Sequence, residues 1–303
     1  MIELNEVNEK NNVDVIFLDF AKAFDKVPHM RLLAKLHAHG IDGHVLKWIS
    51  SWLSDRMQRV CLDGHSSQWA SVLSVVPQGS VLGPLLFLIF INDLDSNVKN
   101  LILKFADDTK VVGEVNSVED GRVLQADMNT LCEWVRRWQM EFNVDKCVVM
   151  HVGSGNIKYQ YAMQGRRLST VETVRDLGVY ISSNLKSAAH CYEASCKANK
   201  MLGLVKRTIK HRSPDLMVRL YKNLVRPHLE YCSSAWSPHY RKDKLLLEKV
   251  QHRFSRLFED LKHLNYSERL RKLKLWSLEE RRNRADLIEL FKMVHGISTV
   301  PLE

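Results

Sequence analysis

The stretch LILKFADDTKVV, residues 101–112, decides the fold of this chain. Two β-like apolar runs, residues 101–105 and 109–112, flank a turn that carries two adjacent carboxylates, Asp107 and Asp108. This pattern predicts a β-hairpin with the carboxylates at its tip. Turn chemistry alone is a common reason for aspartates at such a place, because their short side chains hydrogen-bond the local backbone. A third acidic position favours a functional role.

That third position is Asp19, which ends the apolar run VDVIFL at residues 13–18. A continuous apolar run is typical of a buried central strand, and a carboxylate at its end is costly unless a cation meets it. If this strand lies beside the hairpin, Asp19, Asp107 and Asp108 converge. Mg²⁺ prefers oxygen ligands and keeps coordination places for substrate phosphates. The sequence therefore predicts a magnesium site made by these three side chains.

Length and composition indicate a folded protein with one large domain or two. The 303 residues are 45% hydrophobic and include only 7 prolines and 13 glycines. Residues 1–12 are polar and lack the apolar segment of a secretory signal. The longest apolar run, residues 81–91, is interrupted by Gly83 and Pro84 and is too short to cross a bilayer. We expect an intracellular, soluble protein, in the nucleus or the cytoplasm.

The six cysteines form no CxxC pair, so we expect reduced and mostly buried thiols. A zinc site built from Cys191, Cys196, His228 and Cys232 is an alternative. Their separations match no usual zinc motif. Core packing is therefore the favoured interpretation.

Charge is distributed unevenly along the chain. Residues 1–185 hold 19 Lys and Arg against 22 Asp and Glu, a net charge of −3, whereas residues 186–303 hold 25 against 13, a net charge of +12. Such asymmetry predicts a polyanion-binding region attached to a more neutral catalytic region. The alternative is a set of solvated helix faces without a partner.

Hydrophobic periodicity predicts an α+β fold whose helices cover one face of an antiparallel sheet. Beyond the strands named above, we expect strands at residues 57–62, 69–76, 147–152, 158–163 and 174–181, and helices at residues 29–39, 44–53, 85–94 and 117–140. Only helical patterns follow, at residues 188–210, 214–230, 242–258, 266–272 and 278–294. The predicted organisation is a polar tail at 1–12, an α+β domain at 13–185 and a basic helical region at 186–303.

Three segments, FLDFAKAFD (residues 17–25), PQGSVLGPLLF (residues 77–87) and FADD (residues 105–108), resemble in order and spacing the palm motifs of reverse transcriptases. The sequences of these motifs most resemble those of non-LTR retrotransposon (LINE) enzymes of the jockey type, and the resemblance covers roughly residues 13–181. The resemblance implies a reverse-transcriptase palm followed by an all-helical, thumb-like region. It also implies an RNA-directed DNA polymerase that extends a primer 3′-hydroxyl by two-metal nucleotidyl transfer, with Mg²⁺, or Mn²⁺ in its place. The implied partners are an RNA template, a DNA primer and deoxynucleoside triphosphates, and no membrane.

The resemblance also implies roles for the three carboxylates and their neighbours. Asp19 and Asp107 are the principal metal ligands and catalytic residues, with Asp108 as the accessory one. The backbone at Phe20 faces the metal. The ring of Phe24 lies beneath the nucleotide sugar and disfavours a 2′-hydroxyl; a plain core phenylalanine is the alternative.

The remaining implied site residues lie farther along the chain. Gln78 and Gly79 belong to the loop that supports the template and the incoming nucleotide. Lys146 lies near the leaving pyrophosphate, although a solvated surface lysine is the alternative. The turn at residues 177–179 supports the primer end.

The chain departs from the family pattern in three ways. Only twelve polar residues precede Val13, where the family carries a fingers region, and no endonuclease domain is recognisable. Val75 stands two positions before the motif proline, where glycine is usual, and is expected to stiffen that turn. We therefore expect a fragment, and two hypotheses stay open: a reverse transcriptase, or a catalytically inactive nucleic-acid-binding remnant of one.

Overall fold

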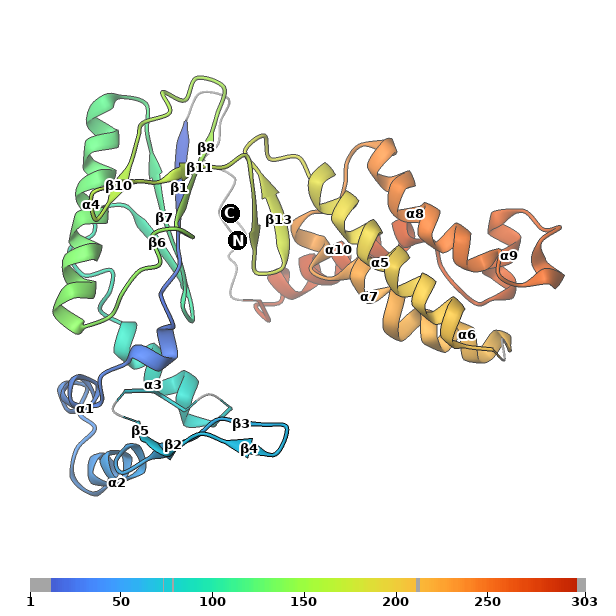
Figure 1. Cartoon of the computed structure of the whole chain (residues 1–303). Coiled ribbons are helices and arrows are strands. Elements are labelled where there is room, and N and C mark those ends of the chain that lie inside the picture. Colours follow the sequence, from blue (N-terminus) through green and yellow to red (C-terminus); the bar gives the residue numbers. More distant parts are fainter. Residues whose placement is uncertain (1–11, 73, 78, 211–212, 299–303) are drawn as a thin grey trace. The chain divides into compact units, whose positions relative to one another are not determined.

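A computed structural model describes residues 12–72, 74–77, 79–210 and 213–298 (Figure 1). Its contacts divide the chain into two compact units, with the division between Val171 and Glu172. We call residues 12–171 the sheet unit and residues 172–298 the helical unit. The domain change expected after residue 185 stays a prediction, and the tail at residues 1–12 lies, except for Asn12, outside the described residues.

The sheet unit is built on five strands in the order β11-β8-β1-β7-β6. Their bounds are β1 (Val13–Leu18), β6 (Leu101–Phe105), β7 (Asp108–Glu114), β8 (Val148–Val152) and β11 (Ser169–Thr170). The predicted buried strand at residues 13–18 is confirmed, because β1 is central and antiparallel to both β7 and β8. Only β11 pairs in parallel, with β8, and this edge was not predicted.

Helix α4 (Val118–Trp138) contributes one layer of the core of the sheet unit, as its amphipathic pattern predicts (Figure 1). It begins at Ser117, whose side chain forms a capping box with Asp120. Leu124, Met128 and Leu131 of α4 are buried in one cluster with strand residues. The same cluster includes side chains from the remaining helices of this unit, which are α1 (His29–Ala38), α2 (Gly43–Leu53) and α3 (Leu82–Ile91).

The predicted strands at residues 57–62 and 69–76 are wrong in length. The structure has two short ladders instead, β2 (Met57–Gln58) with β5 (Ala70–Ser71) and β3 (Cys61–Leu62) with β4 (His65–Ser66). The turn at Asp63 and Gly64 is confirmed, with φ of 47° and 82°. All eight strand residues are exposed, so no buried face extends the pairing. The expected strand at 158–163 is likewise reduced to β9 (Ala162–Met163), paired with β10 (Arg166–Arg167).

The helical unit opens with a hairpin of β12 (Thr173–Asp176) and β13 (Val179–Ser182), so the single strand expected at 174–181 is wrong. Leu177 and Gly178 reverse the chain, with φ of 44° and 90°. Six α-helices follow, α5 (Ala188–Thr208), α6 (Pro214–Leu220), α7 (Pro227–Glu230), α8 (Arg241–Ser255), α9 (Tyr266–Lys272) and α10 (Leu278–Val294). The expected helix at 214–230 is divided by the π-helical turn η3 (Tyr221–Val225).

All six cysteines are free, as expected, but the expectation that most are buried is wrong. Only Cys147 and Cys191 are buried, whereas three are exposed: Cys61, Cys196 and Cys232. Within the described ranges no group of three or more His, Cys, Asp and Glu side chains is arranged to hold a metal ion, so the disfavoured zinc cluster is not assembled. None of the described helices combines the length and the hydropathy that a membrane span needs.

Candidate active site

The two acidic segments of the sequence meet at one end of the central sheet. Phe105 pairs with Asp108, so Ala106 and Asp107 form the two-residue turn of the predicted hairpin, with Ala106 at φ 53°. Leu18 pairs with Thr109 at the end of β1. Since Asp19 follows Leu18 and Asp108 precedes Thr109 in antiparallel strands, the backbone positions of Asp19 and Asp108 lie at the same end of this ladder. The side-by-side strands on which the carboxylate prediction depended are therefore present.

The segment at residues 141–147 holds the backbone around Asp19. The amide of Asn143 donates to the Asp19 carbonyl at 2.8 Å, and the amide of Ala21 donates to the Glu141 carbonyl at 2.8 Å. These two bonds flank the bridge between Phe20 and Phe142. In such a pair the amide and carbonyl of Phe20 point away from its partner strand. The Phe20 carbonyl therefore faces the side of β1 on which β7 lies, as its expected role requires.

Lys146 lies beside the first acidic residue. Its Nζ is 3.4 Å from Oδ2 of Asp19, and the two side chains are 66% and 38% exposed. The neighbouring Cys147 is buried, and its Sγ accepts a hydrogen bond from the Asp19 amide at 3.5 Å. Burial raises the pKa of the Cys147 thiol to about 11, so it adds no negative charge near Asp19. No sequence pattern singles out Cys147 or Asn143, because their roles depend on contacts with Asp19, which is more than 120 residues away in the chain.

Phe24 lies on the short helix η2 (Ala23–Lys26) and is half-buried. Its ring stacks on the buried Phe87 of α3, with centroids 4.4 Å apart. Its carbonyl accepts a hydrogen bond from the amide of Val76 at 2.8 Å. The motif at residues 17–25 and the loop that precedes α3 are thus joined through this residue, whose side chain is only partly buried.

The loop before α3 depends on glycine at two points. Gly79 is exposed and has φ of 81°, a backbone conformation that L side chains rarely adopt. A Cβ at Gly83 would lie 2.7 Å from the carbonyl oxygen of Pro77. The Ser80 hydroxyl connects the two ends of the turn, donating to Pro77 at 2.7 Å and accepting from the Gly83 amide at 2.9 Å. Gln78, the other predicted residue of this loop, lies outside the described residues.

Val75 adopts the conformation that explains why glycine is usual at its position. Its φ is 142°, and it is the only β-branched residue with positive φ in the described ranges. Its carbonyl oxygen lies 2.9 Å from Nε2 of His29, and the Pro28–Ser74 bridge lies beside it. The expected stiffening of this turn therefore takes the form of a strained backbone.

The donor set has the chemistry that a hard divalent cation requires. Asp107 is half-buried, Asp108 exposed and Asp19 partly exposed, so carboxylate oxygens reach the surface at one end of the sheet. The Phe20 carbonyl supplies a further oxygen. The side chains are not gathered into a metal-binding cluster within the described ranges, and Lys146 is the cation next to Asp19. The residues fit magnesium in kind, and binding would require the carboxylates to draw together.

Comparison with known proteins decides the family. A family model described as reverse transcriptase (RNA-dependent DNA polymerase) matches residues 3–181. The chain belongs to this family. The fold predicted from the sequence, a reverse-transcriptase palm followed by helices, is thereby confirmed, and the motifs at residues 17–25, 77–87 and 105–108 all lie within the matched range.

Among curated relatives, this reverse transcriptase chain is similar to the RNA-directed DNA polymerase from mobile element jockey of Drosophila melanogaster, with 27% identity over 79% of this chain and 28% of that protein. The jockey protein of Drosophila funebris is 28% identical over 83% of the chain and 29% of its own length. The resemblance to jockey-type enzymes is confirmed. The chain spans about a third or less of these relatives.

Among solved structures, the apo telomerase of Candida tropicalis aligns with 85% of this chain and 44% of its own, at 10% identity and a TM-score of 0.48. A telomerase of Candida albicans with a fragment of telomeric RNA aligns with 86% and 51%, at 12% identity and a TM-score of 0.47.

Proposed function

We propose that this chain is the polymerase core of a non-LTR retrotransposon reverse transcriptase, an RNA-directed DNA polymerase that acts inside the cell, in the nucleus or the cytoplasm. The observation that carries the proposal is the strand register of β1 and β7, which brings Asp19 to the end of the sheet where Asp107 and Asp108 form the hairpin tip. Its substrates are an RNA template, a DNA primer and deoxynucleoside triphosphates.

Asp19 and Asp107 would hold two Mg²⁺ ions, with Asp108 and the Phe20 carbonyl as further ligands; Mn²⁺ would serve in their place. When bound, such a pair lowers the barrier of phosphoryl transfer by neutralising the attacking and leaving oxygens. The chain itself supplies their positions. The Asn143 amide donates a hydrogen bond to the Asp19 carbonyl and holds the backbone there, and the turn at Ala106 sets the backbone position of Asp107.

Lys146 and Phe24 would bind the incoming nucleotide at its two ends. Lys146 is two-thirds exposed and carries its ammonium group beside Asp19, where the triphosphate must approach the ions. Phe24 is held by its stacking on Phe87, so its ring would meet a 2′-hydroxyl as a fixed obstacle and favour deoxynucleotides. Gly79 and Gln78 belong to the loop proposed to support the template and the nucleotide base, where a side chain at Gly79 would be strained.

A second candidate is a nucleic-acid-binding chain without polymerase activity. One observation favours it: the carboxylates do not form a ready-made metal cluster in the described parts of the chain. Both candidate functions use the strongly basic helical unit to bind nucleic acid. They differ in whether the chain adds a nucleotide to a primer.

Primer extension on an RNA template separates them. We expect the chain to incorporate deoxynucleotides in Mg²⁺, and Asp107→Asn to lower incorporation by at least about 10³-fold, because a metal ligand contributes mainly to the transition state. Asp215→Asn is the matched control, since Asp215 is an exposed aspartate of α6 in the helical unit. RNA binding by both variants together with no incorporation by the unmodified chain would support the second candidate and overturn the first.

A further inference from the structure

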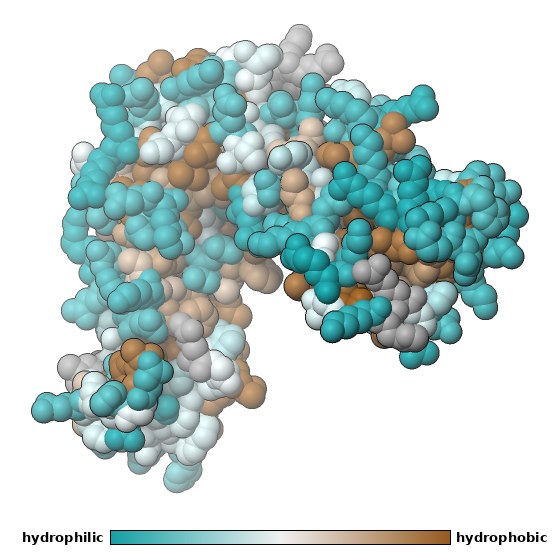
Figure 2. All heavy atoms as spheres, turned by 45° about the vertical axis from the view of Figure 1, so that its right-hand side comes forward, coloured by the Kyte–Doolittle hydropathy of each residue, from teal (hydrophilic) through white to brown (hydrophobic). Residues whose placement is uncertain are grey.

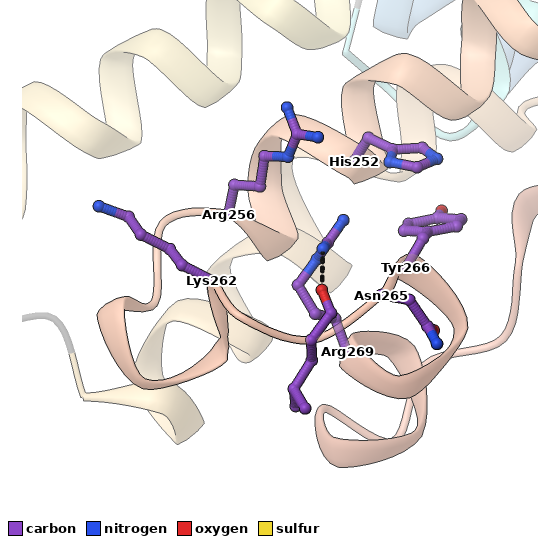
Figure 3. A pocket seen from close by; sticks show the side chains of 7 residues that line it. His252, Arg256, Lys262, Asn265, Tyr266 and Arg269 are labelled. Atoms are coloured by element: carbon purple, nitrogen blue, oxygen red, sulfur yellow. Dashed lines mark hydrogen bonds between the residues drawn. The ribbon is translucent and has the colours of Figure 1, made fainter.

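The helical unit contains a cavity of about 520 Å³ at the end of α8, bounded by the loop that follows and by α9 (Figure 3). Three cationic side chains line it, Arg256, Lys262 and Arg269, together with the rings of His252 and Tyr266. No Asp or Glu occurs among the described residues that line it. Its volume lies within the range of roughly 300–1,000 Å³ that is typical of small-ligand sites.

Arg269 is a fixed and uncompensated charge in this cavity. It is only 4% exposed, and its Nε donates to Ser255 Oγ at 3.1 Å while its Nη1 donates to the Leu264 carbonyl at 2.6 Å. No ion pair joins it to a carboxylate in the described parts of the chain. A buried cation without an opposite charge is costly. An anion that enters the cavity would form an ion pair with Arg269 and reduce this cost.

Arg256 and Lys262 are exposed and line the same cavity, although their side chains extend in different directions (Figure 3). Lys262 also pairs with Glu259 at 2.6 Å, but both side chains are more than half exposed. Such surface pairs contribute little, so Lys262 can exchange this partner for a ligand at small cost. The cavity thus combines one rigid guanidinium with two adjustable cations, which suits a tetrahedral anion with several oxygens.

The aromatic wall of the cavity is flat and uncharged. The rings of His252 and Tyr266 stack with centroids 3.4 Å apart. Burial, and then the charges of Arg269 and Arg256, lower the pKa of His252, so the imidazole is neutral at pH 7. The Tyr266 hydroxyl is turned to Glu248 and Gln251 and takes no part in the cavity's charge. Proteins that bind single-stranded nucleic acid combine cationic side chains with aromatic rings on which bases stack, and this cavity has both kinds of side chain.

We propose that this cavity binds a backbone phosphate of a single-stranded nucleic acid, with the adjoining nucleoside against the His252–Tyr266 stack. The inference deepens the proposed function, because it rests on the chain handling nucleic acid, and it names the place in the helical unit where one phosphate is held. A nucleic acid is favoured over a free nucleotide because the surrounding region is itself cationic, with 25 Lys and Arg against 13 Asp and Glu in residues 186–303. Hydrophilic side chains cover most of the face of the helical unit seen in Figure 2.

The test measures binding of a fluorescent single-stranded RNA to the full chain by anisotropy at several salt concentrations, in chelator and without nucleotides. The variant is Arg256→Gln with Lys262→Gln. The matched control is Lys249→Gln with Lys272→Gln, which removes the same charge from exposed positions of α8 and α9 that do not line the cavity. Each phosphate contact to a single strand contributes about 0.7 to the slope of log affinity against log salt, so we expect the slope to fall by about 1.4 and affinity at 0.1 M salt by about tenfold.

The comparison of the cavity variant with the control either supports or overturns the proposed phosphate site. A loss in the cavity variant at least threefold greater than in the control supports the site, provided that circular dichroism shows both variants folded. Equal losses would assign the effect to general charge and overturn it. Titration with a deoxynucleoside triphosphate and with inorganic phosphate gives the second arm: if either binds as tightly as RNA and loses affinity in the cavity variant, the nucleic-acid assignment fails. RNA binding through the cavity without primer extension would retain this inference and overturn the polymerase proposal, since no catalytic residue is involved.

Discussion

Within the described residues, the two units differ in how many of their buried polar atoms lack a hydrogen-bond partner. In the sheet unit, Asp14 is fully buried and accepts hydrogen bonds from Tyr161 Oη and His151 Nδ1, both at 2.6 Å, and from Asn156 Nδ2 at 2.8 Å. In the helical unit, Nε2 of His190 and both terminal nitrogens of Arg282 are buried without a partner. The sheet unit has one such atom among its described residues, the hydroxyl of Thr109.

Lys35, a buried lysine of the sheet unit, is paired within the interior as Asp14 is. Lys35 is 4% exposed, pairs with Asp93, and has its Nζ 3.8 Å from the ring centre of Trp138. Burial lowers its pKa, while the Asp93 carboxylate opposes that shift. The sheet unit therefore gives partners to the buried charged side chains Asp14 and Lys35. In the described part of the helical unit, Arg282 and His190 instead keep buried donor atoms without a hydrogen bond, although the charges of Glu248, Glu279 and Asp286 act on Arg282.

The largest expected effect comes from removing Asp14, because three buried donors would then lose their acceptor at once. We expect Asp14→Ala to lower the free energy of unfolding of the sheet unit by about 3–5 kcal/mol. Chemical denaturation followed by circular dichroism, with hydrogen exchange at β1 and β8 to locate the loss, measures it.

Asp145→Ala is the control for Asp14. Asp145 pairs with Arg166 at 3.2 Å, but the two side chains are 84% and 69% exposed. Such a pair contributes about 1 kcal/mol or less. Similar losses in the two variants would mean that the buried network is no stronger than a surface pair, and the contrast between the units would fail.

A smaller effect is expected in the helical unit as the pH falls. Burial lowers the pKa of His190 to about 4, and its Nδ1 accepts a hydrogen bond from the Tyr180 amide, so the folded chain holds it neutral. The unfolded chain takes up a proton below about pH 6.5 that the folded chain refuses. Stability is therefore full above about pH 6.5 and is lost between about pH 6.5 and 4, by up to about 3 kcal/mol.

Guanidinium titrations of the full chain and of His190→Gln at pH 7 and pH 4.5 check this prediction. Carboxylates also titrate in this range, so the informative quantity is the difference between the two proteins. We expect the loss of stability on acidification to be at least about 1.5 kcal/mol smaller in His190→Gln. Parallel losses would show that protonation of His190 does not contribute to the loss of stability on acidification.

Local patterns predicted a large part of the fold. The hairpin at residues 101–112, the central strand and the capped helix at Ser117 follow from periodicity and turn chemistry within a few residues. The segment at residues 174–181 was predicted as one strand from its β-branched pattern, although the resemblance implied a turn at residues 177–179, and the structure has a hairpin that turns at Leu177 and Gly178. Short strands were overextended where no buried face supports them.

In the candidate site, too, local patterns predicted some residues, whereas others depend on contacts between distant segments. Asp19, Asp107 and Asp108 were predicted from their positions at strand ends and from the sequences of the motifs. The strand register brings their segments together. The contributions of Asn143 and Cys147 depend on pairing across the sheet. No periodicity within either segment encodes such a contact. The buried charges of Asp14 and Lys35 were missed for the same reason, since a single charged residue in an apolar pattern does not reveal its partners.

We expect the smallest change in the free energy of unfolding from a substitution at Val75, where the backbone of the sheet unit is strained. Val75 has φ of 142°, which costs roughly 1–3 kcal/mol for a β-branched residue. Glycine would remove that cost but add about 0.5–1 kcal/mol of unfolded-state entropy. We therefore expect Val75→Gly to raise the free energy of unfolding by about 1 kcal/mol.

The neighbouring Val76 provides the control, because it is fully buried and lacks positive φ. Val76→Gly should destabilise the sheet unit by about 2–4 kcal/mol through the lost side chain and the added flexibility. The loop keeps its shape in Val75→Gly because its anchors involve backbone atoms that glycine retains: the Val75 carbonyl with His29 and the Val76 amide with Phe24. Destabilisation by Val75→Gly as well would mean that the valine side chain stabilises the loop more than its backbone strains it.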